Sequence, residues 1–172
     1  MTHYRIVPDE SRVWVDARSS VHKIHSTADG IDGFVELDFM DGDGIDPTKP
    51  PAGRLSLPVR RLTSGNSLED RELQKFVDIA RYPTIDGVLT AMERVEGERY
   101  RISGDLALRG VSRPCQDVVR ITPVDDRTIR LEGESTFDIR DFGLNPPRIL
   151  MLRVEPTVVV RIALIARAPE EE

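Results

Sequence analysis

Two histidines three residues apart are the side chains of this sequence best placed to bind a metal ion. His22 and His25 would do so if their imidazoles shared one face of a helix, with a carboxylate such as Asp29 as a third ligand. No fourth ligand is apparent nearby, and the surrounding residues are typical of a loop. We therefore expect both histidines at the surface or at a rim, and no bound metal.

Cys115 is the candidate nucleophile, because the neighbouring Arg113 could lower the pKa of its thiol. A nucleophile also needs an organised base, and the sequence contains neither that arrangement nor a Gly-x-Ser-x-Gly turn. The glycine-rich segment 41–44 lacks the lysine and the following helix of a phosphate-binding loop. We therefore expect a lone reduced thiol, no cofactor and no enzymatic activity.

Arg140 and Asp141 form the remaining candidate for chemistry. An arginine–aspartate pair can steady a turn or bind a polar head group, and the sequence leaves both roles open. Asp70, further back in the chain, is expected to cap a helix or to tie down the loop before it.

The elements that would position these residues are mainly strands. Apolar and polar residues alternate over most of the chain, and turn residues interrupt the alternation. The predicted strands cover residues 13–19, 33–39, 54–60, 84–95, 98–109, 117–123, 128–139 and 152–167, and residues 21–25 are predicted as a loop. Pro58 inside the third strand favours an edge position or a bulge.

One helix is predicted between the third and fourth strands. Asn66 or Ser67 would cap it, and acidic residues follow in its first turns, where the helix dipole favours them. Pro83 prevents it from continuing. Its apolar face would comprise Leu68, Leu73, Phe76, Val77 and Ile79 or Ala80.

Eight long strands joined by short connections predict an all-β fold, an eight-stranded antiparallel barrel with one inserted helix. Closure removes the unpaired edges of such a sheet, and a barrel of this size can hold one small ligand. The chain of 172 residues is long enough for one such domain, expected over residues 1–168, with an acidic tail at 169–172.

The inward face of these strands is almost entirely aliphatic, with several small residues. Small inward residues leave room for a ligand or admit close packing of the backbone, and both alternatives stay open. The small inward residues are Ala17, Gly87, Ala91, Gly104, Gly133 and Ser135.

Composition limits the class of partner. The net charge is −6 and the basic residues are scattered, which argues against nucleic acid. No segment has the length and hydropathy of a membrane-spanning helix, and the N-terminus lacks the apolar core of a signal peptide. We therefore expect a cytoplasmic protein without an integral membrane segment.

Three groups of residues resemble the YceI-like polyisoprenoid-binding proteins. They are Tyr82-Pro83, the run Gly104-Asp105-Leu106-Ala107-Leu108-Arg109-Gly110-Val111-Ser112-Arg113-Pro114, and the run Phe137-Asp138-Ile139-Arg140-Asp141-Phe142-Gly143-Leu144. The resemblance implies a lipocalin-like barrel with a hydrophobic tunnel for isoprenoid chains, including isoprenoid quinones. The chain departs from the usual pattern at Ser19, at Gly87 and around Glu72, where relatives tend to carry His, Phe and His.

The sequence thus predicts a protein that binds an isoprenoid or another long-chain apolar lipid inside a barrel, as a carrier, store or protector. The alternatives are a small-molecule enzyme at the barrel mouth and a ligand-free, stress-related interaction protein that acts through its surface, for example as a homodimer. The predicted ligand-binding residues are Val15, Ala17, Leu37, Leu57, Leu73, Phe76, Ile79, Ile85, Gly87, Leu89, Ile102, Leu106, Leu108, Phe137, Phe142 and Met151.

Overall fold

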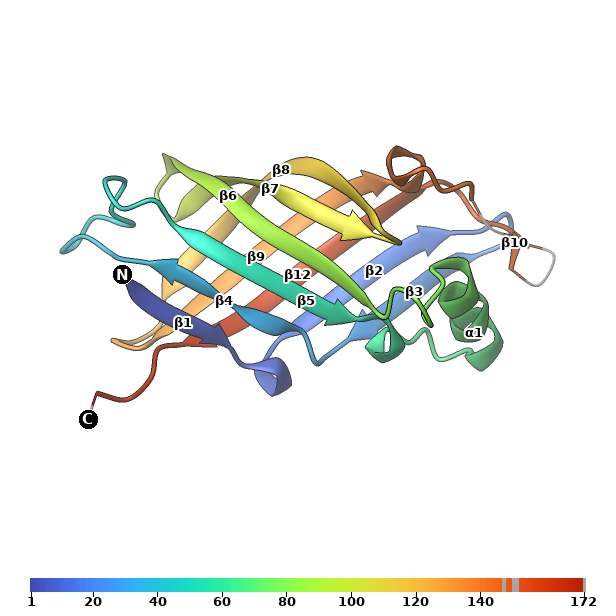
Figure 1. Ribbon diagram of the computed structural model, residues 1–172, viewed down its shortest axis with the longest axis horizontal. Helices are drawn as coiled ribbons and strands as arrows, with labels where there is room; N and C mark the ends of the chain where they lie inside the picture. Colours follow the sequence, from blue (N-terminus) through green and yellow to red (C-terminus); the bar gives the residue numbers. More distant parts are fainter. Residues whose placement is uncertain (147, 150–151, 172) are drawn as a thin grey trace.

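A computed structural model describes residues 1–146, 148–149 and 152–171. The strands wrap into a barrel with α1 at one end (Figure 1). The elements are β1 (Thr2–Ile6), η1 (Pro8–Glu10), β2 (Arg12–Arg18), β3 (Lys23–Ala28), β4 (Asp32–Leu37), β5 (Ala52–Pro58), η2 (Val59–Arg61), α1 (Ser67–Phe76), β6 (Thr84–Glu96), β7 (Arg99–Leu108), β8 (Val111–Pro123), β9 (Thr128–Asp138), η3 (Ile139–Phe142), β10 (Arg148–Ile149), β11 (Leu152–Arg153) and β12 (Thr157–Arg167).

The predicted eight-stranded antiparallel barrel is confirmed, although two of its strands are broken. The sheet runs in the order β1-β4-β5-β6-β7-β8-β9-β12-β2-β3, and an additional pairing of β1 with β12 closes it. Along one edge, β12 pairs first with β2 and then with β1, so β1 and β2 act as one interrupted strand. β3 and β4 form its interrupted neighbour, because they pair with β2 and β1 in turn.

A buried serine holds the break between β1 and β2. The Ser11 hydroxyl donates to the Val7 carbonyl at 2.8 Å and accepts from the Ile165 N–H at 3.1 Å. Ser11 is completely buried, so these bonds satisfy its polar atoms where the ladder is interrupted.

Several predicted boundaries were wrong. β1 was not predicted, and a loop was predicted where β3 begins at Lys23. β8 begins at Val111 rather than at residue 117, and the predicted last strand is divided into β11 and β12. The helix ends at Phe76, because Val77 caps it and Asp78 adopts a positive φ of 55°.

The two ends of the barrel differ in how they are filled. At the end bearing both termini, which we call the packed half, large inward side chains are buried and Ile45 folds over them, its N–H donating to the Tyr100 hydroxyl at 3.0 Å. The packed half contains Tyr4, Ile6, Leu37, Ile45, Tyr100 and Ile129. The other end, beside α1, we call the open half.

Candidate functional site

The open half encloses a cavity of about 420 Å³. Its walls come from inward-facing residues of the barrel strands, and α1 and η3 contribute at the mouth. Most of its lining side chains are aliphatic or aromatic, and many are only half-buried although they face inward. Such a cavity accommodates an apolar ligand of moderate size.

Most of the predicted ligand-binding residues line this cavity. They are Val15, Ala17, Leu57, Leu73, Phe76, Ile85, Gly87, Leu89, Ile102, Leu106, Leu108, Phe137 and Phe142. Leu37 and Ile79 are not among its lining residues: Leu37 is 0% exposed in the packed half, and Ile79 follows the end of α1. Met151 lies outside the described residues. Whether the lining residues contact a ligand stays a prediction.

Glycines occupy very different surroundings in the cavity wall. A Cβ on Gly87 would meet only the Leu55 Cβ, at 4.0 Å, so the absent side chain leaves space. A Cβ on Gly104 would lie 2.4 Å from the Val88 carbonyl oxygen, so this glycine permits close approach of two strands. Both alternatives that the sequence left open are therefore realised, each at a different position.

A bulge in β6 changes which residue of this strand faces the interior of the barrel. The register between β6 and β7 shifts between Leu89 and Ala91, so that Met92 is paired with Ile102. Met92 lines the cavity, whereas Ala91 is exposed. The prediction of an inward Ala91 was wrong, because strict alternation fails across one extra residue.

Helix α1 contributes Leu73 and Phe76 to the cavity wall, with Val77 just beyond its end. The Asn66 side chain caps α1 by accepting from two backbone N–H groups, and this confirms the predicted start. Asp70 accepts from the Ser64 N–H at 2.9 Å and from the Ser64 hydroxyl at 2.7 Å, so it ties down the preceding loop as predicted.

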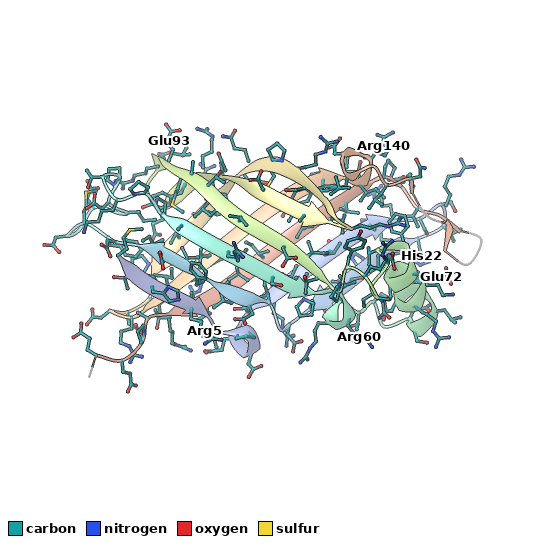
Figure 2. All side chains as sticks on the ribbon, in the orientation of Figure 1. Arg5, His22, Arg60, Glu72, Glu93 and Arg140 are labelled. Atoms are coloured by element: carbon teal, nitrogen blue, oxygen red, sulfur yellow. The ribbon has the colours of Figure 1, made fainter. Side chains whose placement is uncertain are left out.

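One predicted helical contact is absent, and one polar contact was missed. Leu68 is 50% exposed, so it does not belong to the inward face of α1. The buried carboxylate of Glu69 lies 3.2 Å from Nε2 of His22, which joins the helix to the segment before β3; Figure 2 shows His22 against α1. This contact fixes the position of the helix over the barrel end.

The predicted pair of Arg140 with Asp141 was wrong. The Arg140 guanidinium binds Asp138, with 2.6 Å between Nη2 and Oδ2, and Asp138 also caps η3. The backbone carbonyl of Asp141 instead accepts from Arg113 Nε at 2.7 Å. Both contacts hold η3 at the mouth, where the buried Phe142 lines the cavity.

The two histidines bind different carboxylates. His25 Nδ1 lies 2.6 Å from Asp16, whereas His22 contacts Glu69. Within the part of the chain that the structure describes, no group of three or more His, Cys, Asp or Glu side chains is arranged to hold a metal ion.

Cys115 and Asp117 are polar residues that line the cavity and were not predicted to do so. Burial raises the pKa of the Cys115 thiol, and the nearby charges of Asp117 and Asp105 raise it further. Burial also raises the pKa of Asp117, partly offset by the Val118 N–H that donates to its carboxyl group. The signal in the sequence was alternation, because Asp117 and Cys115 lie two and four residues before the inward Val119. The predicted strand began at residue 117, too late to include Cys115.

The cavity and barrel agree with a family model, the YceI-like domain, which matches residues 4–166. The chain belongs to the YceI-like family. The most informative sequence relatives include a UPF0312 protein of Pseudomonas syringae pv. tomato and one of Azotobacter vinelandii. They are 28% identical over 128 residues and 25% identical over 118 residues, respectively. These matches cover 66% and 62% of this chain, and 66% and 62% of the respective relatives, so the matched region spans about two thirds of their length.

Solved structures share the YceI-like fold with lower sequence identity. Burkholderia cenocepacia BcnA has a TM-score of 0.78 at 15% identity and covers 93% of this chain and 98% of its own. A polyisoprenoid binding domain from Saccharophagus degradans, implicated in plant cell wall breakdown, has a TM-score of 0.79 at 14% identity and covers 98% and 100%. At these identities the likeness concerns the fold alone.

Helices capable of crossing a membrane are absent from the described residues of this YceI-like chain. α1 spans 10 residues, well below the roughly 20 that the hydrocarbon core of a bilayer requires.

Proposed function

We propose that this YceI-like protein binds an isoprenoid or another long-chain apolar lipid in the open half of its barrel, as a carrier, store or protector. The observation that carries the proposal is the apolar cavity of about 420 Å³. Leu106, Leu108 and Phe137 face inward and line it, yet they are only half-buried. An apolar occupant would remove this surface from water, at roughly 0.8 kcal/mol for each of its buried methylene groups.

An isoprenoid chain, including that of an isoprenoid quinone, matches the apolar character of the lining. The cavity receives side chains from opposite walls of the barrel and from α1, so a flexible chain can contact many of them at once. The name of the Saccharophagus degradans neighbour describes that protein as a polyisoprenoid binding domain. That property of the neighbour, together with the shared family, supports the same ligand class here.

Binding without catalysis is part of the proposal. Two of the three charged groups considered for an enzyme at the barrel mouth, the third being Asp141, are engaged in contacts within the protein: Arg140 binds Asp138, and His22 contacts Glu69. These contacts give each group a structural role. The cavity, in turn, favours ligand binding over a filled barrel that acts only through its surface. A cytoplasmic location stays a prediction, which fractionation of the native host would test.

Extraction of the purified protein tests the proposal directly. The protein would be purified from its native host, extracted with organic solvent and analysed by mass spectrometry. We expect a lipid with a long apolar chain at a substantial fraction of one molecule per barrel. Repeated extraction without such a lipid, together with failure to bind added isoprenoids, would contradict the proposal.

Gly87→Phe places a ring in the cavity and provides a second test. The new side chain would displace about two ligand methylene groups, which corresponds to roughly a tenfold loss of isoprenoid affinity. Val95→Phe is the control, because Val95 lies on the same strand, is exposed and does not line the cavity. Equal affinities of the two variants would show that Gly87 does not border the bound lipid.

A further inference from the structure

Asp117 is an acidic side chain on an inward face that is otherwise largely apolar. It lies on β8 two residues before Val119 and four before Ile121, both of which are buried, and it is paired across the sheet with Ile102. Because side chains on one strand alternate between faces, Asp117 shares the inward face of these residues. It lines the cavity and is half-buried.

The backbone around Asp117 marks a division of the barrel wall. The ladder between β8 and β9 extends from Pro123 only to Val119, which is paired with Gly133. Beyond this point the first part of β8 pairs with β7 alone, and it includes Pro114, whose missing N–H suits a strand edge. Asp117 lies just beyond the last pair of the β8–β9 ladder, and Ser135 of β9, two residues past Gly133, also lines the cavity.

The charge of Asp117 has no compensating cation within the described part of the chain. Burial raises its pKa and the Val118 N–H lowers it, and no basic side chain contributes. Among the other acids that line the cavity, Glu69 contacts His22 and Asp70 accepts from Ser64. The remaining three, Asp105, Glu134 and Glu155, are exposed. Arg54 is a basic lining residue, but its side chain is exposed and it alternates with the inward Leu55.

We propose that Asp117 selects the end group of the ligand and that this end group is an uncharged hydroxyl. A hydroxyl both donates and accepts, so it can donate to the carboxylate or accept from the carboxylic acid. A phosphate, diphosphate or carboxylate would instead meet a partly desolvated negative charge without a cation beside it, and such like-charge contacts oppose binding strongly. An ammonium group would attract the carboxylate, but it would lose far more hydration than a hydroxyl on entering this largely apolar cavity. The inference rests on the proposed function and assigns a ligand class to the same cavity.

Four probes with the same chain separate the contributions of chain and end group: farnesol, farnesyl phosphate, farnesylamine and the hydrocarbon farnesene. Their affinities for the wild-type protein would be measured by calorimetry near neutral pH. We expect farnesol to bind at least about tenfold more tightly than farnesyl phosphate, and more tightly than farnesene, because one satisfied hydrogen bond in the cavity favours it. Tightest binding of farnesylamine or farnesyl phosphate would overturn the inference.

Two substitutions of Asp117 distinguish its charge from its hydrogen bond. Asp117→Asn removes the charge and keeps a hydrogen-bonding group, so it should retain farnesol and gain about tenfold in affinity for farnesyl phosphate. Asp117→Val should bind farnesol no better than farnesene. Glu98→Gln, an exposed position at the β6–β7 turn, makes the same change in net charge away from the cavity and should leave all ratios unchanged.

Farnesene separates failure of this inference from failure of the proposed function. If no protein form binds any of the four probes, the proposed function fails. If farnesene and farnesol bind but the Asp117 variants leave every ratio unchanged, the inference about Asp117 alone is overturned. Retained binding of farnesene by both variants shows that they are folded.

Discussion

Leu37 and Leu106 face the interior of the same barrel in very different surroundings. Leu37 is 0% exposed in the packed half, whereas Leu106 is half-buried and borders the cavity in the open half. Alternation in the sequence assigns both residues to the inner face. The comparison shows that an inward position does not by itself distinguish a structural core from a binding surface.

Several local features account for the difference between the halves. In the packed half, large side chains meet across the barrel and Ile45 closes its end. In the open half, the missing side chain of Gly87 leaves space, and the ladder between β8 and β9 stops at Val119. α1 covers the open end without filling it, because Leu73 and Phe76 line the cavity rather than occupy it.

The largest expected effect is on stability and separates the two leucines. Leu37→Ala should cost about 2–5 kcal/mol of unfolding free energy, because it removes a fully buried side chain and leaves a cavity. Leu106→Ala should cost less than about 2 kcal/mol, since its side chain already borders open space. Urea unfolding of both variants measures this, and equal losses would contradict the division into two halves.

Isoprenoid affinity should respond in the opposite order for the same two variants. Leu106→Ala should weaken binding, because Leu106 lines the cavity, whereas Leu37→Ala should leave it within about twofold of wild type as long as the protein is folded. A stronger loss for Leu37→Ala would place the ligand in the packed half and overturn the assignment of the site.

Two glycines of the open half provide the next largest effect. Gly104→Ala should destabilise the protein by about 1–3 kcal/mol, because the new Cβ would lie 2.4 Å from the Val88 carbonyl oxygen. Gly87→Ala should be neutral or stabilising by up to about 1 kcal/mol, since alanine loses less backbone entropy on folding. Thermal and urea unfolding of the pair would test this, and destabilisation by Gly87→Ala would refute the open space there.

The smallest expected effect concerns two carboxyl groups with opposite pKa shifts. Asp38, in the packed half, accepts from Lys49 at 3.0 Å and from the Thr2 N–H at 2.8 Å, and these bonds lower its pKa from 3.8 to about 2. Its contribution to stability is therefore present above pH 3.8 and is lost as the pH falls toward about 2. Asp38→Asn should lower the melting temperature at neutral pH. In strong acid, where Asp38 is protonated, the variant and the wild type should melt at the same temperature.

Asp117 should show the reverse dependence, because burial raises its pKa. Its proton is lost from the unfolded chain first as the pH rises, so stability declines from the ordinary value of 3.8 up to the raised pKa of the folded state. Asp117→Asn should raise the melting temperature at neutral pH and have no effect well below pH 3.8. The two aspartates serve as controls for each other. Changes of the same sign in the melting temperatures of the two asparagine variants at neutral pH would contradict the difference in their surroundings.

Most of the fold was predictable because alternation and turn residues are local signals. The inward faces of β7, β9 and β12, the start of α1 at Ser67 and the loop tied down by Asp70 followed from neighbouring residues. β3 was missed because Ile24 is its one large apolar residue. The resemblance of the sequence to YceI-like proteins supplied the ligand class, and the family itself is confirmed by the match over residues 4–166.

Contacts between distant segments required the tertiary structure. Arg140 forms its ion pair with Asp138 rather than with the adjacent Asp141. A single bulge in β6 places Ala91 on the outer face and Met92 on the inner face. Whether the missing side chain of Gly87 or Gly104 leaves empty space depends on the atoms of the neighbouring strand, and local sequence does not show which atoms those are.

The sequence by itself therefore determined the strands, their inner faces and their family, because these depend on residue type and period along the chain. Only the tertiary structure decided that one half is packed and the other hollow. It also decided that Asp117 faces the hollow half at the point where β8 and β9 part. Those properties depend on volumes and hydrogen bonds between strands that are far apart in sequence, and local alternation carries no information about them.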